Sequence, residues 1–452
     1  MLTAELQGVR AERDRFRAEV QELKAQLRAD STTSSAPPST DKSWKPQSER
    51  VQTDRRTGGQ PGHVGQTLAI SPTPDQVIHL PLTGHCGCGQ AWDDVPVEDR
   101  LARQVYDLPE TRLHVTEYRV EVKICPCCTA RQQAAFPTTV PGQVQYGPRV
   151  QALTTYLHTV HFIPLARTAE IVRTLCGSAP SESTIVVNLN VGAERLDDFE
   201  MQLKAGLGRQ SVLYADETGS KVNGKLHWLH IVTCASLTLY GHHISRGSEA
   251  LMAMGVLPDY RGLLMHDAWR TYLSLPMDHA LCNAHLLREL RGLSEYFQQQ
   301  WAGDLREALQ LVYHQRKAKT LTAEGIAAFK ARFDELVTAG LDTNPAIERV
   351  EGQRGQVKQS RARNVALRCQ RYKREMLRFL DDDWQPFDNN LAEQGIRMMC
   401  VKRKISGGFR SENGGQVFCR IRSYVATLQQ QGLSVWAGLV SIFAGNVFLP
   451  AF

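Results

Sequence analysis

Two aspartates occupy positions where a carboxylate has a chemical use. Asp216 ends the apolar segment SVLYA, and Asp267 ends the apolar segment GLLMH. A carboxylate at the end of a buried strand costs free energy unless it is paired, hydrogen-bonded or bound to a metal. A single aspartate in such a position is as readily explained as the turn residue that ends the strand. Two at the ends of neighbouring strands predict a shared divalent cation, and Mg²⁺ (or Mn²⁺) prefers such oxygen ligands.

A third carboxylate lies on the segment WQPFDNNLAEQGIRMMCVKRKISGGF, residues 384–409. Asp388 or Asn389 is expected to cap a helix here, which leaves Glu393 in its first turns. Glu393 and Arg397 are four residues apart, and such a pair ordinarily stabilises an exposed helix by about 0.2–0.5 kcal/mol. With two aspartates holding metal, however, Glu393 would complete a two-metal site. Such a site activates an attacking water or 3′-hydroxyl for displacement at phosphorus.

Basic residues follow this glutamate and are expected to hold a phosphate backbone: Arg397, Lys402, Arg403, Lys404 and Arg410. Glycines 407 and 408 would let the chain approach that backbone closely. A second basic stretch, residues 349–378, holds ten Lys and Arg residues against two acidic ones. It suits phosphate contacts, although a solvated basic helix has the same composition.

Cysteines predict a second kind of metal site. Cys125 and Cys128 have the two-residue separation of a tetrahedral zinc half-site. The other half-site is Cys86 with Cys88, or His85 with Cys88, and its spacing is less regular. Tight turns separated by strands are typical of a zinc ribbon, in which the metal replaces an insufficient core. Cys127 is interpreted as a bystander.

The whole pattern predicts a multidomain α+β protein. The expected parts are a coiled coil (1–29), a flexible basic linker (30–68), a zinc-ribbon-like β domain (69–143), a helical DNA-binding segment (144–207), an α/β catalytic domain (208–415) with an all-helical insertion at about 286–382, and a C-terminal helical tail (416–452). An amphipathic helix packed on its own domain is the alternative for 1–29. The coiled coil favours self-pairing.

Composition limits the class of protein. The chain has 452 residues, 42% of them hydrophobic and 22% charged, with a net charge of +6. This is the composition of a globular protein with a modest preference for polyanions. No apolar signal core or long uncharged apolar run is present, so we expect a cytoplasmic, nucleoid-associated protein. Eleven cysteines in a chain of this length do not indicate a secreted disulfide framework.

Several motifs together resemble one family. YADET, MHDAWRTYL, CNAHLLREL and FDNNLAEQGIRMMCVKRKISGGF occur in the order found in DDE transposases of the insertion sequence 66 family, after GGQPGHVGQTL, the cysteine turns and VQYGPRVQALTTYL. The resemblance extends over essentially the whole chain. It implies an RNase H-like catalytic domain with Asp216, Asp267 and Glu393 as metal ligands. The sequence HCGC departs from the C-x2-C of the family's first zinc half-site.

Two further features are left open by the sequence. Glu393 follows Asp267 by 126 residues, which implies a long insertion in a minimal RNase H core. Cys282 and His285 form a C-x2-H pattern without a matching pair nearby, so they either support the site and its substrate or belong to the core. Trp228 is interpreted as a core residue rather than a stacking platform.

The resemblance implies a transposase that binds the inverted-repeat ends of an insertion sequence, cleaves DNA strands and joins them to target DNA. Coupled cleavage at two ends requires at least a homodimer, and accessory proteins from neighbouring reading frames are expected. Two alternatives remain: a catalytically silent DNA-binding descendant, and a nuclease that hydrolyses without joining. The intact set of three carboxylates favours an enzyme.

Overall fold

The computed structural model describes residues 67–349, 357–382 and 384–452, with Gly65 and four isolated positions before it, Arg13, Phe16, Val20 and Lys24. Apart from these isolated positions, the predicted coiled coil (1–29) and nearly all of the predicted linker (30–68) therefore lie outside the described residues. The chain divides into two compact units, Ser43–His114 on the one hand and Met1–Lys42 with Val115–Phe452 on the other.

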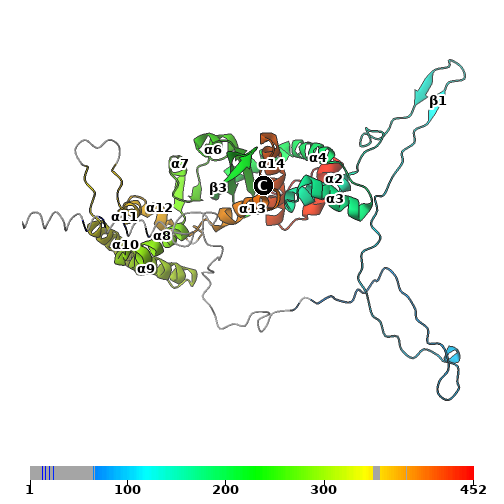
Figure 1. The fold of residues 1–452 in the computed structure, drawn as a ribbon, viewed down its shortest axis with the longest axis horizontal. Helices are drawn as coiled ribbons and strands as arrows, with labels where there is room; N and C mark the ends of the chain where they lie inside the picture. Colours follow the sequence, from blue (N-terminus) through cyan, green and yellow to red (C-terminus); the bar gives the residue numbers. More distant parts are fainter. Residues whose placement is uncertain are drawn as a thin grey trace, which may run out of the picture. The chain divides into compact units, whose positions relative to one another are not determined.

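A mixed sheet is the centre of the larger unit (Figure 1), and it confirms the prediction of an α+β chain with a mixed sheet. Its strand order is β5-β4-β3-β6-β7. Three of its strands pair antiparallel with one another in chain order: β3 (Val212–Val222), β4 (Lys225–Thr233) and β5 (Thr238–His243). The other two run parallel to β3: β6 (Leu263–His266) and β7 (Asp278–Leu281).

The turn between β3 and β4 sets the register of this hairpin. Asn223 has φ 51° and Gly224 has φ 80°. An Asn-Gly pair with positive φ at both positions forms the two-residue turn whose twist matches that of the flanking strands. Val222 consequently pairs with Lys225, and the pairing continues without interruption to Tyr214 and Thr233.

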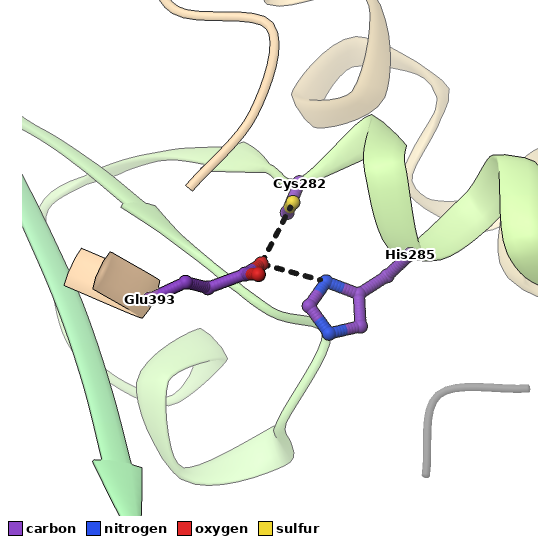
Figure 2. Close-up of side chains that lie close together, drawn as sticks. All are labelled: Cys282, His285 and Glu393. Carbon is purple, nitrogen blue, oxygen red and sulfur yellow. Dashed lines mark hydrogen bonds and ion pairs between the residues drawn. The ribbon is translucent and has the colours of Figure 1, made fainter. Parts of the chain in front are cut away.

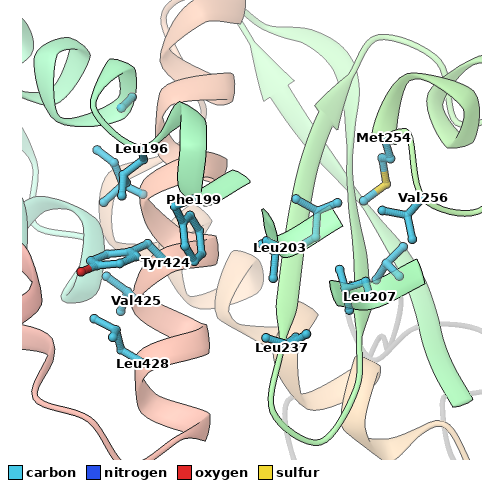
Figure 3. Close-up of a cluster of buried hydrophobic side chains, with 14 of the residues drawn as sticks. Leu196, Phe199, Leu203, Leu207, Leu237, Met254, Val256, Tyr424, Val425 and Leu428 are labelled. Atoms are coloured by element: carbon cyan, nitrogen blue, oxygen red, sulfur yellow. The ribbon is translucent and has the colours of Figure 1, made fainter. Parts of the chain in front are cut away.

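Helices cover both faces of the sheet. One face packs through Leu213, Ala215 and Val232 against α5 (Asp197–Gly208) and α6 (Ser248–Met254). Figure 3 shows Leu203 and Leu207 of α5 in this cluster. The other face packs through Leu229, Ile231 and Tyr240 against α13 (Asn390–Ser406). The short helix α7 (Arg270–Leu273) lies between β6 and β7 in the chain.

Helix α14 (Glu412–Gln430) closes the β5 edge of the sheet. The backbone N–H of Tyr240 donates to Ser423 Oγ at 2.8 Å, and the N–H of Thr238 donates to Thr427 Oγ1 at 3.2 Å. An edge strand presents unpaired backbone groups that invite association with other strands. These two hydroxyls satisfy the edge, so α14 protects the sheet as well as contributing Tyr424 to its core.

Helices that precede the sheet join the same core. They are α2 (Pro148–Thr155), the π-helical turn η3 (Tyr156–Val160), α3 (Leu165–Cys176) and α4 (Glu182–Glu194), and α15 (Val435–Ala444) packs with them from the C-terminal end. Ser181 caps α4 by accepting the N–H of Thr184, as its position before an apolar helix suggests.

Residues between β7 and α13 form a separate helical group with its own apolar core. Its helices are α8 (Asn283–Phe297), α9 (Gln300–Lys317), α10 (Ala323–Thr343), α11 (Arg361–Arg371), α12 (Lys373–Leu377) and the 3₁₀ turn η4 (Arg378–Leu380). Leu290, Leu305 and Phe333 are among the residues buried in this core. Figure 1 shows these helices beside one another.

The cysteine-rich region has little regular structure. Residues 67–147 contain the short hairpin of β1 (Val122–Ile124) and β2 (Arg131–Gln133) and the turn η2 (Trp92–Asp94). Apolar side chains such as Leu80 and Leu101 are exposed, although their alternation in the sequence favours strands. None of the described helices combines the length and the apolar character needed to cross a membrane.

Gly395 allows α13 to approach the sheet, and its replacement by alanine tests this packing. A Cβ at this position would lie 2.4 Å from Ile231 Cδ1. We expect Gly395→Ala to lower the free energy of unfolding by about 1–3 kcal/mol, because an overpacked core forces side chains from their rotamers. Urea denaturation measures this change. Gly208→Ala is the control, since a Cβ there meets nothing within 4 Å; equal stability of the two variants would contradict the close contact.

Candidate active site

The parallel pairing of β3 with β6 positions the two aspartates. Tyr214 of β3 pairs with Met265 of β6, and each aspartate follows two residues later on its own chain segment. The carboxyl ends of parallel strands meet at one edge of a sheet. Asp216 and Asp267 are therefore neighbours at this edge, as their positions after apolar segments predicted.

Asp216 points toward the face that α13 covers. It pairs directly with Ile231, and directly opposed residues in an antiparallel ladder share a face. Ile231 packs against Ala392 and Ile396 of α13. The next residue, Glu217, therefore points to the opposite face.

Asn389 fixes the start of α13 beside β3. Its Nδ2 donates to the carbonyl oxygen of Ala215 at 2.8 Å, directly before Asp216. Its side chain consequently makes no cap on the helix. Asp388 instead accepts the N–H of Asn390 through Oδ1 at 3.1 Å. The N-cap position of α13 is Asn389, and its side chain connects the helix to the sheet, while Asp388 just before it accepts the first N–H of the helix.

Negative charge accumulates around Asp216. Burial, followed by the charges of Glu217 and Asp267, raises the pKa of Asp216 well above its ordinary value, and the charge of Glu393 adds to this effect. Burial and the charge of Glu217 likewise raise the pKa of Asp267. These carboxylates therefore lie close enough to disfavour one another's ionisation.

Glu393 lies on α13 with its carboxylate directed at the start of α8 (Figure 2). Its side chain is 15% exposed. Glu393 Oε1 lies 3.7 Å from Cys282 Sγ and 3.6 Å from His285 Nδ1. The C-x2-H motif, which the sequence left between support and core, thus contacts the predicted catalytic glutamate.

Glu217 is a buried charge that sequence reasoning missed. Arg246 donates to its Oε1 through Nε at 3.0 Å and Nη2 at 2.6 Å, and Tyr272 donates to Oε2 at 2.7 Å. The Arg246 guanidinium also lies 4.9 Å from the ring centre of Trp228 and 4.5 Å from that of Trp269. Trp228 is therefore a cation–π partner. The only available signal was the second acid in YADET.

Four of the five predicted DNA-contacting cations are exposed: Arg397, Arg403, Lys404 and Arg410. Lys402 is only 3% exposed, so its predicted phosphate contact does not fit the structure. Its Nζ lies 4.3 Å from the ring centre of Phe409 and hydrogen-bonds Ser406 Oγ at 3.3 Å. Burial lowers the pKa of Lys402 to about 8. The 3.6-residue period turns this cation inward while its neighbours face solvent.

Gly408 approaches protein backbone. A Cβ at Gly408 would lie 2.4 Å from the carbonyl oxygen of Lys221, and the next residue, Phe409, donates its N–H to that oxygen at 2.7 Å. Phe409 in turn accepts the N–H of Asn223. The close approach predicted for phosphate is thus made to the β3–β4 hairpin.

The two predicted zinc half-sites lie in different compact units, and each forms a tight turn. In the first, Cys86 donates its N–H to Gln90 at 2.8 Å, and hydrogen bonds from Gln90 and then Cys86 lower the pKa of Cys88. In the second, the N–H groups of Cys128 and Cys127 lower the pKa of Cys125. Hydrogen bonds of this kind favour the thiolate, which is the form that binds metal. The backbone of His85 forms an isolated antiparallel β-bridge with that of Ala91.

Comparison with known families identifies the family of the chain. Residues 143–417, more than half of the chain, match the family model described as Transposase IS66 family. The chain therefore belongs to the IS66 transposase family, which makes DNA its partner. Residues 1–69 match a second model, a family of unknown function (DUF6444). No curated protein matches the chain.

The raised pKa of Asp216 predicts a pH-dependent effect of Asp216→Asn. In the wild type, protonated Asp216 contributes stability that is complete below its ordinary value of 3.8 and is lost as the pH rises through the raised folded-state pKa. The variant has no such loss. We therefore expect metal-free Asp216→Asn to unfold at higher urea concentration than the wild type at about pH 7.5, with a smaller difference at about pH 4.5.

The exposed Asp259 supplies the control, since Asp259→Asn should leave stability similar to the wild type at both pH values. If Asp216→Asn is less stable than the wild type at the higher pH, the claim that burial and neighbouring carboxylates raise the pKa of Asp216 is contradicted.

Proposed function

We propose that this protein is a DDE transposase that binds the inverted-repeat ends of an insertion sequence, cleaves DNA strands and transfers them to target DNA. The observation that supports the proposal is the pairing of β3 with β6, because it brings the carboxyl ends of the two segments that carry Asp216 and Asp267 next to each other. The charge of Glu393 on that helix acts on Asp216. We assign the sheet, an antiparallel meander followed by two parallel strands, to the RNase H-like class.

The three carboxylates suit Mg²⁺ or Mn²⁺, because both take oxygen ligands. Glu217 forms an ion pair with Arg246, whereas burial, followed by the charge of Glu217, raises the pKa values of both Asp216 and Asp267. A divalent cation held by Asp216, Asp267 and Glu393 would relieve this repulsion. When bound, two such cations supply activation of the attacking oxygen and stabilisation of the leaving oxygen.

The residues around the three carboxylates position them by hydrogen bonds, and we assign them no contact with phosphate. Arg246 and Tyr272 hold Glu217 on the opposite face, which keeps a fourth carboxylate out of the metal set. Asn389 holds the start of α13 at β3, and so positions Glu393 relative to Asp216. The N–H of Trp269 donates to Asp267 Oδ1 at 3.0 Å and leaves its other oxygen available.

DNA contacts are proposed for the exposed cations that follow the glutamate, Arg397, Arg403, Lys404 and Arg410. Helical residues 144–207 and the zinc-bound cysteine turns would recognise the element ends. Pairing of residues 1–29 would join at least two protomers, and accessory proteins would assist them. A purely phosphate-directed set of cations orients DNA without reading its sequence.

Replacement of any one carboxylate by its amide tests the proposed chemistry. We expect Asp216→Asn, Asp267→Asn and Glu393→Gln each to reduce Mg²⁺-dependent cleavage of an end-containing DNA by at least about a thousandfold, since metal binding contributes several kcal/mol to the transition state. End binding, measured by gel shift, should remain. The control is Glu335→Gln on the exposed surface of α10.

Products of the same assay separate the alternatives. Joined strands support transposition, and hydrolysed strands alone support a nuclease. A wild type that binds ends but does not cleave them with either Mg²⁺ or Mn²⁺ would overturn the enzymatic proposal in favour of a silent DNA-binding descendant.

Bound zinc is expected to depend on the cysteine turns. We expect Cys128→Ser to lower the zinc content of the purified protein by about one ion per chain, because each thiolate supplies one of four tetrahedral ligands. Cys127→Ser, which changes the interpreted bystander, should retain that ion. Elemental analysis after dialysis measures both, and equal zinc in the two variants would contradict the ligand assignment.

A further inference from the structure

Three donor atoms of different chemistry converge at the start of α8. Cys282 Sγ, His285 Nδ1 and Glu393 Oε1 all lie within 4.8 Å of one another. The first two lie three positions apart at the start of α8, and the third comes from α13 (Figure 2). The arrangement therefore joins two elements that are far apart in the sequence.

The distances between these donors fit one tetrahedral zinc ion. With Zn–S of about 2.3 Å and Zn–N or Zn–O of about 2.1 Å, the edges of such a tetrahedron are about 3.4–3.6 Å long. Two edges are 3.7 Å from Cys282 Sγ to Glu393 Oε1 and 3.6 Å from His285 Nδ1 to the same oxygen. The third edge, from Sγ to Nδ1, is within 4.8 Å, and side-chain rotation would have to bring it to the tetrahedral length.

Both side chains at the start of α8 present a donor atom to Glu393. The buried Cys282 Sγ lies at the N-cap of α8 and accepts the N–H of Asn389 at 3.2 Å. Burial, and then the charge of Glu393, raise the pKa of Cys282 to about 12, so a metal has to displace the thiol proton when it binds. His285 Nδ1 is buried and makes no hydrogen bond to any of the described residues. A ring nitrogen that is directed at a carboxylate and a sulfur, without a hydrogen-bond partner, is typical of a ligand position.

The donor set distinguishes this site from the proposed Mg²⁺ site. Sulfur and imidazole select zinc, whereas Mg²⁺ takes oxygen ligands. We propose that Cys282, His285 and Glu393 bind one Zn²⁺, with the fourth position open to solvent, and that this ion withdraws Glu393 from the catalytic set. Binding releases the thiol proton to solvent. Zinc would thereby inhibit the enzyme reversibly, and this regulatory part rests on the proposed function.

Cobalt binding tests the site independently of DNA cleavage. The full-length protein carrying Cys88→Ser and Cys128→Ser provides a background in which the cysteine turns no longer complete a tetrahedral site. Addition of Co²⁺ to this metal-free background should produce thiolate-to-cobalt charge-transfer absorption, and Zn²⁺ should abolish it. A further Cys282→Ser should remove the band, and His285→Gln should weaken Co²⁺ affinity by more than about tenfold.

Cys400→Ser is the matched control, because this half-buried thiol lies on α13 outside the three-donor cluster. The band should remain in that variant. Absence of the band in the background, or a band that Cys282→Ser leaves intact, would overturn the site and reduce the contact to a thiol hydrogen bond. If Cys282→Ser does not fold, His285→Gln at a partly exposed position decides the question.

Inhibition is measured separately in the wild type, whose cysteine turns are loaded with zinc beforehand. Further Zn²⁺ added to a Mg²⁺-supported cleavage reaction should slow it in the wild type and in Cys400→Ser, and a zinc-selective chelator equimolar with the added zinc should restore the rate. A zinc-insensitive reaction would refute the regulatory part while leaving the cobalt result valid. Failure of all cleavage would count against the proposed function and not against the metal site, because the cobalt band needs no DNA.

Discussion

The register between β3 and β6 is the constraint on which the site depends. Side chains alternate between the two faces of a sheet, so a shift of one residue would exchange Asp216 for Glu217 on the face that α13 covers. Apolar packing holds this register: Leu213 pairs with Leu264, and both side chains are fully buried. The Asn223-Gly224 turn fixes the separate register of β4 against β3. The aspartates themselves are therefore placed by apolar packing, despite the repulsion between their charges.

The same alternation divides the acidic residues into two groups with different roles. On one face, Glu217 is neutralised by Arg246, which lies between two tryptophan rings. On the other, burial and neighbouring carboxylates raise the pKa of Asp216. A fold that pairs Glu217 with a cation and buries Asp216 among carboxylates has the electrostatics of a cation site. Asn389 and Gly395 extend this arrangement to Glu393, by a hydrogen bond to β3 and by close contact with β4.

Local sequence patterns predicted the elements and their ends. Apolar runs that stop at Asp216 and Asp267 indicated strands whose carboxyl ends carry acids, and the helix after residue 388 was expected from its cap and periodicity. What the sequence did not reveal depends on long-range contacts. Glu393 and Cys282 are 111 residues apart, so their contact has no local signature. The burial of Lys402 follows from aromatic rings on two segments, and the close approach at Gly408 from a hairpin almost 190 residues earlier.

The most direct measurement is a crystal structure of the protein with Mn²⁺, in which anomalous scattering locates the ion. The account predicts a peak between the carboxylates of Asp216 and Asp267, within about 2.0–2.6 Å of an oxygen from each, with Glu393 contributing at the same site. Such a peak should be absent from Asp216→Asn crystals. Manganese bound elsewhere, with the two aspartates turned away from one another, would contradict the central claim.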